Sequence, residues 1–236
     1  MRAIKLFLVG AAAMLLSACA ATKPIPLDRA QAEHIKTIGI VTPDIPQKAT
    51  SFVAATPGQS FGLLGALIDA GIQASRESAL EASLKTLQFS ADKVFSEKLA
   101  EAVKAQGYSV VMVPASRSEK GEFLAKYPTG GNVDAYLDVV ATDYGYLAAG
   151  TQAAAPFRPY MYLKCRLVRA DNAAVLMKDQ VAYNPLNSPK DIVSISPDPA
   201  FAFATSDMMD SQPENVAEGL RVAFRQSATT VGTLLR

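Results

Sequence analysis

The sequence predicts an α/β (α+β) domain whose mixed sheet has about five strands and includes an antiparallel meander. Three observations lead to this class: a β-branched run near the N-terminus, a helix followed directly by a glycine and a strand, and alternating segments in the second half of the chain. A long Ala/Gly-rich helix, a second helix and a C-terminal helix are expected to pack on this sheet.

The N-terminus has the pattern of a secretory signal peptide. Arg2 and Lys5 form a basic start, residues 6–16 form an apolar core, and small residues follow. A bilayer-spanning helix needs about 20 apolar residues, so this core is too short for a retained anchor. We therefore expect residues 1–18 to be removed.

The segment Leu16–Cys19, Leu-Ser-Ala-Cys, resembles the lipobox of bacterial lipoproteins. That resemblance implies cleavage before Cys19, diacylglycerol on its thiol and an acyl chain such as palmitate on its new amino group. Two or more chains hold firmly, since each buried CH₂ contributes about 0.8 kcal/mol. Ala20 stands where Asp would retain a lipoprotein, and by the same resemblance this implies the periplasmic face of the outer membrane in a two-membrane bacterium.

Residues 19–34 are expected to be the lipidated cysteine and a short tether, because they contain prolines and no apolar period. Residues 35–236 are expected to form a single periplasmic domain. The chain has 23 Lys+Arg and 22 Asp+Glu, and removal of the signal leaves a net charge of −1. This balance implies no electrostatic partner, and the lack of a basic run argues against nucleic-acid binding.

The first strand is expected at Ile35–Thr42, where a β-branched run stops at a proline, and residues 43–57 are expected to be a loop. A long helix follows over Gly58–Leu87. A second helix begins after Ser90, its predicted N-cap, and stops at Gly107.

Tyr108–Val113 is expected to be a strand, and a capping box predicts a short helix over Ser116–Lys126. Alternation of apolar residues with more polar ones from Val133 to Thr142 marks the clearest strand. Tyr160–Arg169 and Ala173–Tyr183 form a hairpin. Residues 184–212 are rich in proline and read as a surface excursion, and Pro213 opens the terminal helix.

This order on a lipidated cysteine resembles the class that includes the TolB amino-terminal domain, the curli-secretion lipoprotein and penicillin-binding-protein activators. The matching residues are Ile38–Val41, Phe95–Tyr108 and Asp134–Leu137. The resemblance implies a fold and no active site. The tether is too short for a synthase activator, and no paired lipid-facing strands indicate a pore.

No catalytic residue, metal ligand or cofactor is expected. His34 is the only histidine, which argues against a Ser-His-Asp triad or a multi-histidine metal site within one chain. Ser90 and Lys93 match the S-x-x-K pattern of serine β-lactamases, but chance and helix capping explain the match better. The acidic group near the C-terminus is assigned to helix dipoles instead of Ca²⁺: Asp207, Asp210 and Glu214.

Two features are candidate interaction sites. Small residues recur at every fourth position of the long helix: Gly58, Gly62, Ala66, Ala70 and Ala74. This ridge either packs inside the domain or docks on another copy or on the bilayer surface. Four tyrosines on adjacent strands form an aromatic strip for glycan or peptide binding, or else simply line the sheet: Tyr136, Tyr144, Tyr160 and Tyr162.

The sequence thus predicts a non-enzymatic, membrane-anchored periplasmic lipoprotein that binds a protein partner, or itself, and helps organise the cell envelope. The alternative is a small-ligand or glycan-binding accessory subunit, and a cell-wall hydrolase or transferase is third. An exposed apolar helix would favour the first, a deep polar pocket the second and convergent titratable groups the third. Cys165 alternates with apolar neighbours and is expected to be buried.

Overall fold

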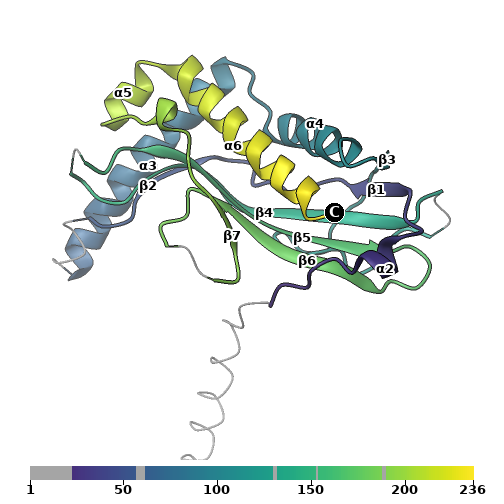
Figure 1. Cartoon of the computed structure of the whole chain (residues 1–236). Helices are drawn as coiled ribbons and strands as arrows, with labels where there is room; N and C mark the ends of the chain where they lie inside the picture. The colour runs from purple at the N-terminus through teal and green to yellow at the C-terminus, as the bar shows by residue number, and fades with distance from the viewer. Residues whose placement is uncertain (1–22, 57–61, 130–131, 153, 188–189) are drawn as a thin grey trace, which may run out of the picture.

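The computed structural model describes residues 23–56, 62–129, 132–152, 154–187 and 190–236. The chain forms two layers, a seven-stranded sheet and a group of helices on one of its faces (Figure 1). The predicted fold class is confirmed, since the sheet is mixed, contains an antiparallel meander and is covered by a C-terminal helix.

The strand order is β3-β1-β4-β5-β6-β7, and β2 pairs with β4 outside this path. The strands are β1 (Thr37–Val41), β2 (Thr50–Val53), β3 (Ser109–Val113), β4 (Ala135–Ala148), β5 (Arg158–Arg169), β6 (Val175–Tyr183) and β7 (Val193–Ile195). β1 runs parallel to both β3 and β4, while β4, β5 and β6 form the antiparallel meander. β1 therefore lies at the centre of the parallel half.

The helical layer is built around the C-terminal helix. The helices are α2 (Arg29–Ala32), α3 (Gly62–Thr86), α4 (Ala91–Lys104), α5 (Ser206–Asp210) and α6 (Pro213–Thr233), with a 3₁₀ turn at Pro199–Phe201. Phe224 of α6 is fully buried, and its ring meets those of Phe95 and Tyr144 at centroid distances of 6.0 and 5.2 Å. The hydroxyl of Tyr146 donates to the carbonyl of Val216 at 3.0 Å, which ties α6 to β4.

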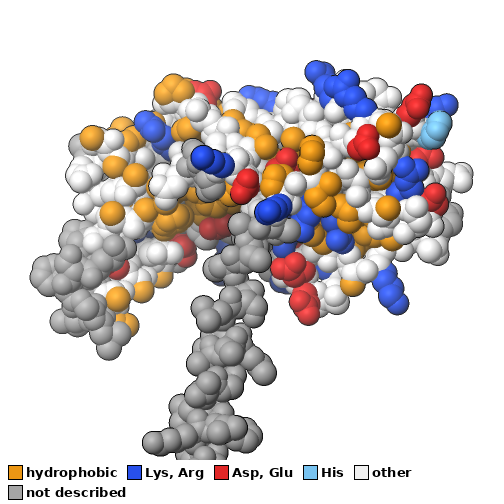
Figure 2. Space-filling model, turned by 60° about the horizontal axis from the view of Figure 1, so that its bottom comes forward, with side chains coloured by type: hydrophobic (Ala, Val, Ile, Leu, Met, Phe, Trp, Pro, Cys, Tyr) orange, Lys and Arg blue, Asp and Glu red, His pale blue; other side chains and the backbone are white. Residues whose placement is uncertain are grey.

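The meander presents different side chains to its two faces. Leu163, Cys165 and Leu167 belong to the core beneath the helices, as alternation along β5 requires. Burial raises the pKa of the Cys165 thiol, and the prediction that this cysteine is buried is confirmed. Lys164 and Arg166 lie on the opposite, helix-free face, which Figure 2 turns forward and which carries charged and hydrophobic side chains together.

Two short strands were not predicted from the sequence. β2 lies within the segment expected to be a loop, and β7 lies within the expected surface excursion, so the sheet has seven strands instead of about five. β2 has four residues and β7 has three. Strands this short contain too few residues to show a recognisable alternation of apolar and polar side chains.

The helix expected over Ser116–Lys126 does not form. The segment is a run of turns and bends that lies against the helix-free face. We name its described part, residues 114–129, the covering segment. Leu124 and Tyr127 pack there with Val41 and Tyr136, so tertiary contacts outweigh the local capping pattern.

The segment expected to be a tether contacts the domain from residue 25 onward. Ile25 exchanges two backbone hydrogen bonds with Lys178 of β6, at 2.7 and 2.9 Å. Asp28 caps α2, and Leu27 packs against the core. Backbone pairing at a sheet edge leaves no signal in side-chain patterning, which explains why the sequence did not predict it.

β2 depends on a close backbone approach at Gly145. Thr50 pairs with Gly145 just beyond a register shift in β4. A Cβ at position 145 would lie 1.9 Å from the carbonyl oxygen of Thr50, and φ there is +150°. Only glycine fits this position.

We expect Gly145→Ala to destabilise the protein by about 3 kcal/mol, because backbone strain and a clash with β2 coincide. Gly71→Ala is the matched control, since Gly71 has open space around it on α3 and alanine favours helix by about 0.5–1 kcal/mol. Urea unfolding measures both. Equal unfolding midpoints for the two variants would contradict the proposed packing of β2.

Candidate functional site

A cleft opens where the parallel strands β1 and β3 end. Its volume is about 620 Å³. The chain after β1, from Thr42 to Gln47, forms one side, and Arg117, Lys120 and Gly121 of the covering segment form another. β1 lies between β3 and β4, so the connections diverge at its carboxyl end, which is where open α/β sheets place ligand sites.

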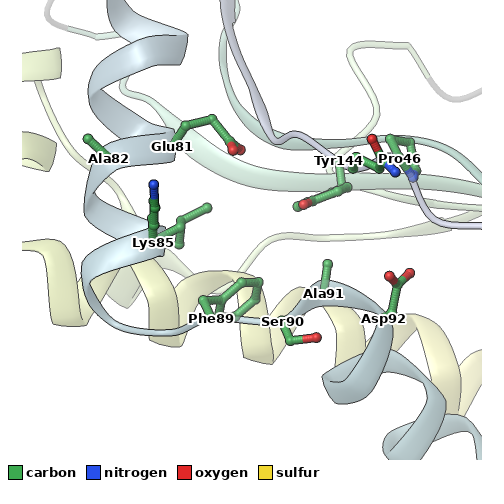
Figure 3. Close-up of a pocket in the computed structure, with 11 residues that line it drawn as sticks. Pro46, Glu81, Ala82, Lys85, Phe89, Ser90, Ala91, Asp92 and Tyr144 are labelled. Carbon is green, nitrogen blue, oxygen red and sulfur yellow. The ribbon is translucent and has the colours of Figure 1, made fainter.

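A second pocket of about 440 Å³ adjoins this cleft, since Pro46, Gln47 and Asp92 line both. It lies between α3, the start of α4 and β4 (Figure 3). Glu81 from α3 and Tyr144 from β4 point toward one another across it. The two hollows together form a continuous candidate site along the carboxyl ends of the parallel strands.

The adjoining pocket is lined by two carboxylates, Glu81 and Asp92, by the ammonium of Lys85 and by a neutral tyrosine. Burial, together with the nearby carboxylates of Glu81 and Asp92, raises the pKa of Tyr144, so its hydroxyl stays protonated and can donate a hydrogen bond. Burial and the neighbouring Asp44 raise the pKa of Asp92. Glu81 already accepts a hydrogen bond from the amide of Ala49 at 2.7 Å. These groups suit a cationic or hydroxyl-bearing ligand.

Ser90 and Lys93, the two residues of the S-x-x-K pattern, have a structural role at the start of α4. The Oγ of Ser90 accepts a hydrogen bond from the amide of Lys93 at 3.4 Å and caps α4, as expected. Both residues are exposed. Within the described residues, no group of three His, Cys, Asp or Glu side chains is arranged to hold a metal ion.

The wall that the covering segment contributes is held by a buried carboxylate, Asp138 of β4. Asp138 is fully buried and accepts hydrogen bonds from Arg117 at 2.7 Å, from the amide of Leu124 at 2.9 Å and from the hydroxyl of Tyr127 at 2.8 Å. Arg166 completes the cluster at 3.8 Å. Among the residues that the structure describes, every partner of this carboxylate except Arg166 comes from the covering segment.

Asp138 was not identified as a site residue from the sequence. Alternation along β4 placed it on a face expected to be wetter, where a carboxylate needs no partner. The covering segment is rich in hydrogen-bond donors, and this feature is visible in the sequence. The sequence does not show which strand residue these donors contact.

The first half of α3, which carries the small-residue ridge, projects from the body of the domain (Figure 1). Ala66, Ala70 and Ala74 are exposed, whereas Gly58 lies outside the described residues and only the backbone of Gly62 is described. Three large apolar side chains beside them are also exposed: Leu67 by 63 %, Ile68 by 57 % and Ile72 by 49 %.

The second half of α3 behaves differently, because its Leu80 and Leu84 are buried in the core. The C-terminal half of the helix therefore contributes to the core, and nearer its start Asp69 accepts a hydrogen bond from the hydroxyl of Thr56. Among the helices that the structure describes, none has the length and apolar character needed to cross a bilayer.

The four tyrosines do not form one exposed strip. Tyr136, Tyr144 and Tyr160 are buried, and Tyr144 faces the helices because the register shift in β4 changes its side. Tyr160 donates to Asp143 at 2.6 Å on the helix-free face, beside Tyr162 at a centroid distance of 5.3 Å. Only Tyr144 lines the candidate site, and Cys19 lies outside the described residues.

Comparison with known proteins gives structural likenesses only. No protein-family model matches the chain, and no curated protein matches it significantly in sequence. A DUF330 protein of Xanthomonas campestris is 13% identical over 85% of this chain and 84% of its own, with a TM-score of 0.42.

Two further likenesses are weaker. A PelC dodecamer of Paraburkholderia phytofirmans is 13% identical over 91% of this chain and 96% of its own, with a TM-score of 0.35. A Caulobacter crescentus protein described as a lipoprotein is 16% identical over 61% of this chain and 80% of its own, with a TM-score of 0.28. At these values the likenesses assign neither a family nor a function.

Proposed function

We propose that this chain is a non-enzymatic lipoprotein, anchored by lipid on Cys19 at the periplasmic face of the outer membrane, that binds a protein partner through the exposed half of α3. The single observation that carries the proposal is the exposure of Leu67, Ile68 and Ile72. An exposed apolar helix is the feature that separates an assembly protein from a ligand-binding or catalytic one.

The geometry of α3 supports a contact surface. Ile68 and Ile72 are one helical turn apart and therefore lie on the same side, with Leu67 beside them. Single exposed apolar side chains are ordinary, but burying a large one contributes about 1.5–3 kcal/mol, so three together favour association. Ala66 and Ala70 add small side chains that let a partner approach the backbone closely.

The lipid anchor is supported by the N-terminal sequence. The basic start, the short apolar core and the Leu16–Cys19 segment occur together and in the right order. A non-enzymatic role is supported by the use of Ser90 as a cap and by the structural role of Asp138, both of which leave these groups committed to hydrogen bonds within the fold.

The cleft supports a second candidate function, a small-ligand or glycan-binding accessory role. Its place at the carboxyl ends of parallel strands, and the pairing of a donor on Tyr144 with acceptors on Glu81 and Asp92, suit a ligand with amino or hydroxyl groups. Both hollows are open to solvent, so we rank this function second.

The partner contact is tested by a photo-cross-linking residue at Ile68 in intact cells. We expect one cross-linked product, and its mass distinguishes a second copy of this chain from a different protein. The same residue at Lys104, which is exposed on α4, is the control and should give none.

The double substitution Leu67→Gln and Ile72→Gln should reduce that product by at least about tenfold, which corresponds to 1.4 kcal/mol of lost contact. Its urea midpoint should not change, because both side chains are exposed. A product that survives the double substitution, or that forms equally from Lys104, would exclude α3 as the contact surface.

The anchor is tested by Cys19→Ser, which removes the thiol that lipidation requires. We expect the unchanged protein to fractionate with membranes and to carry acyl mass on Cys19, whereas the variant loses that mass and no longer fractionates with membranes. Unchanged membrane fractionation of the variant would contradict lipid anchoring.

A further inference from the structure

Three cations meet around one aromatic ring on the helix-free face. The Nζ of Lys164, the guanidinium of Arg166 and the Nζ of Lys178 lie 5.2, 4.5 and 5.9 Å from the ring centroid of Phe123. We name Lys164, Arg166 and Lys178 the basic cluster. Arg166 and Lys178 are direct register partners on β5 and β6, and Lys164 precedes Arg166 by two residues on the same face.

The basic cluster is not neutralised by its surroundings. Arg117 is a fourth cation nearby, since it shares Asp138 with Arg166. The only carboxylates paired with these groups among the described residues are Asp138 and Glu122, the latter at 2.9 Å from Lys164. Four cations against two carboxylates leave the cluster positive, and like charges placed opposite one another on adjacent strands are unfavourable without an anion.

The titration of Lys178 is consistent with this surplus. Burial, followed by the charges of Arg166 and Lys164, lowers the pKa of the Lys178 ammonium. An anion that contacts the cluster would relieve this repulsion. The cation–π contacts with Phe123 hold the side chains together but supply no counter-charge.

The proposed lipidation site, Cys19, is only a few residues along the chain from a segment that contacts this cluster. Ile25 exchanges backbone hydrogen bonds with Lys178, so the chain leaves the domain beside the cluster itself. Five residues lie between Cys19 and Ile25, and the six Cα–Cα steps extend at most about 20 Å. Lys23, which is exposed, adds another positive charge to this short connection.

We propose that the helix-free face docks on the bilayer that holds the lipid, with the basic cluster against the phosphates of anionic phospholipids. The inference rests on the proposed lipid anchor. The anchor limits the distance of the domain from the bilayer, and the basic cluster sets its orientation, because the cations are attracted to the anionic headgroups. Docked in this way, the domain directs α4 and α6, which lie on the opposite face of the sheet, away from the membrane (Figure 1).

The experiment uses the full lipidated protein in vesicles with a nitroxide quencher on the headgroups. The chain contains no tryptophan, so Val175→Trp places a single fluorophore on β6, where Val175 is 40 % exposed beside the cluster. Quenching is compared in phosphatidylcholine vesicles and in vesicles that also contain phosphatidylglycerol. Mass spectrometry of the purified protein establishes the acyl groups independently.

We expect strong quenching only with phosphatidylglycerol, and its loss at high salt. Lys164→Gln with Lys178→Gln should lower the docking equilibrium about five- to thirtyfold, since each basic residue near an anionic surface contributes about a factor of five. The matched control is Lys93→Gln with Lys104→Gln, which removes the same charge from exposed positions on α4 and should leave quenching unchanged.

The two proposals fail in different ways. If the purified protein carries no acyl mass, both the proposed lipid anchor and the proposed docking are wrong. The protein can also be lipidated while its quenching is weak in both kinds of vesicle, equal in both, or unchanged by the substitutions of Lys164 and Lys178. Any of these results contradicts the docking but not the lipid anchor.

Discussion

The buried carboxylate of Asp138 is the constraint on which the functional surfaces depend. A charge removed from water is tolerated only when it is paired and its oxygens accept hydrogen bonds, and here Arg117, Tyr127 and the amide of Leu124 provide both. These partners lie on residues 114–129, so satisfying one carboxylate folds a whole segment over the sheet. Arg117 also donates to the carbonyl of Thr42, which ties the segment to the end of β1.

Two surfaces follow from that one arrangement. On one side, Lys120 and Gly121 form a wall of the cleft, with the amide of Gly121 donating to Asp44 at 2.6 Å. On the other side, Phe123 brings the basic cluster together. The exposed side chains of Leu67, Ile68 and Ile72 on α3 line neither of these surfaces. The proposed membrane surface and the proposed partner surface are therefore separate.

Much of the fold could be predicted from the sequence, because α4 and α6 have strong caps or periods and β4 alternates clearly. The small edge strands could not, since three or four residues carry no period. The basic cluster could not either: net charge is near zero, and Lys178 joins Arg166 only through the register of β5 and β6. The tyrosines were identified by strand position, but one register shift moves Tyr144 to the other face of the sheet.

Hydrogen exchange of Asp138→Asn measures the dependence on this carboxylate most directly. The substitution removes the charge that compensates Arg117 while keeping the side chain's shape, so exchange should accelerate throughout residues 117–127, and most at the amide of Leu124. The amides of β5 and β6 should keep their protection, because their ladder does not involve residue 138's side chain. Unchanged protection of residues 117–127 would show that Asp138 does not hold the covering segment, and would contradict the account.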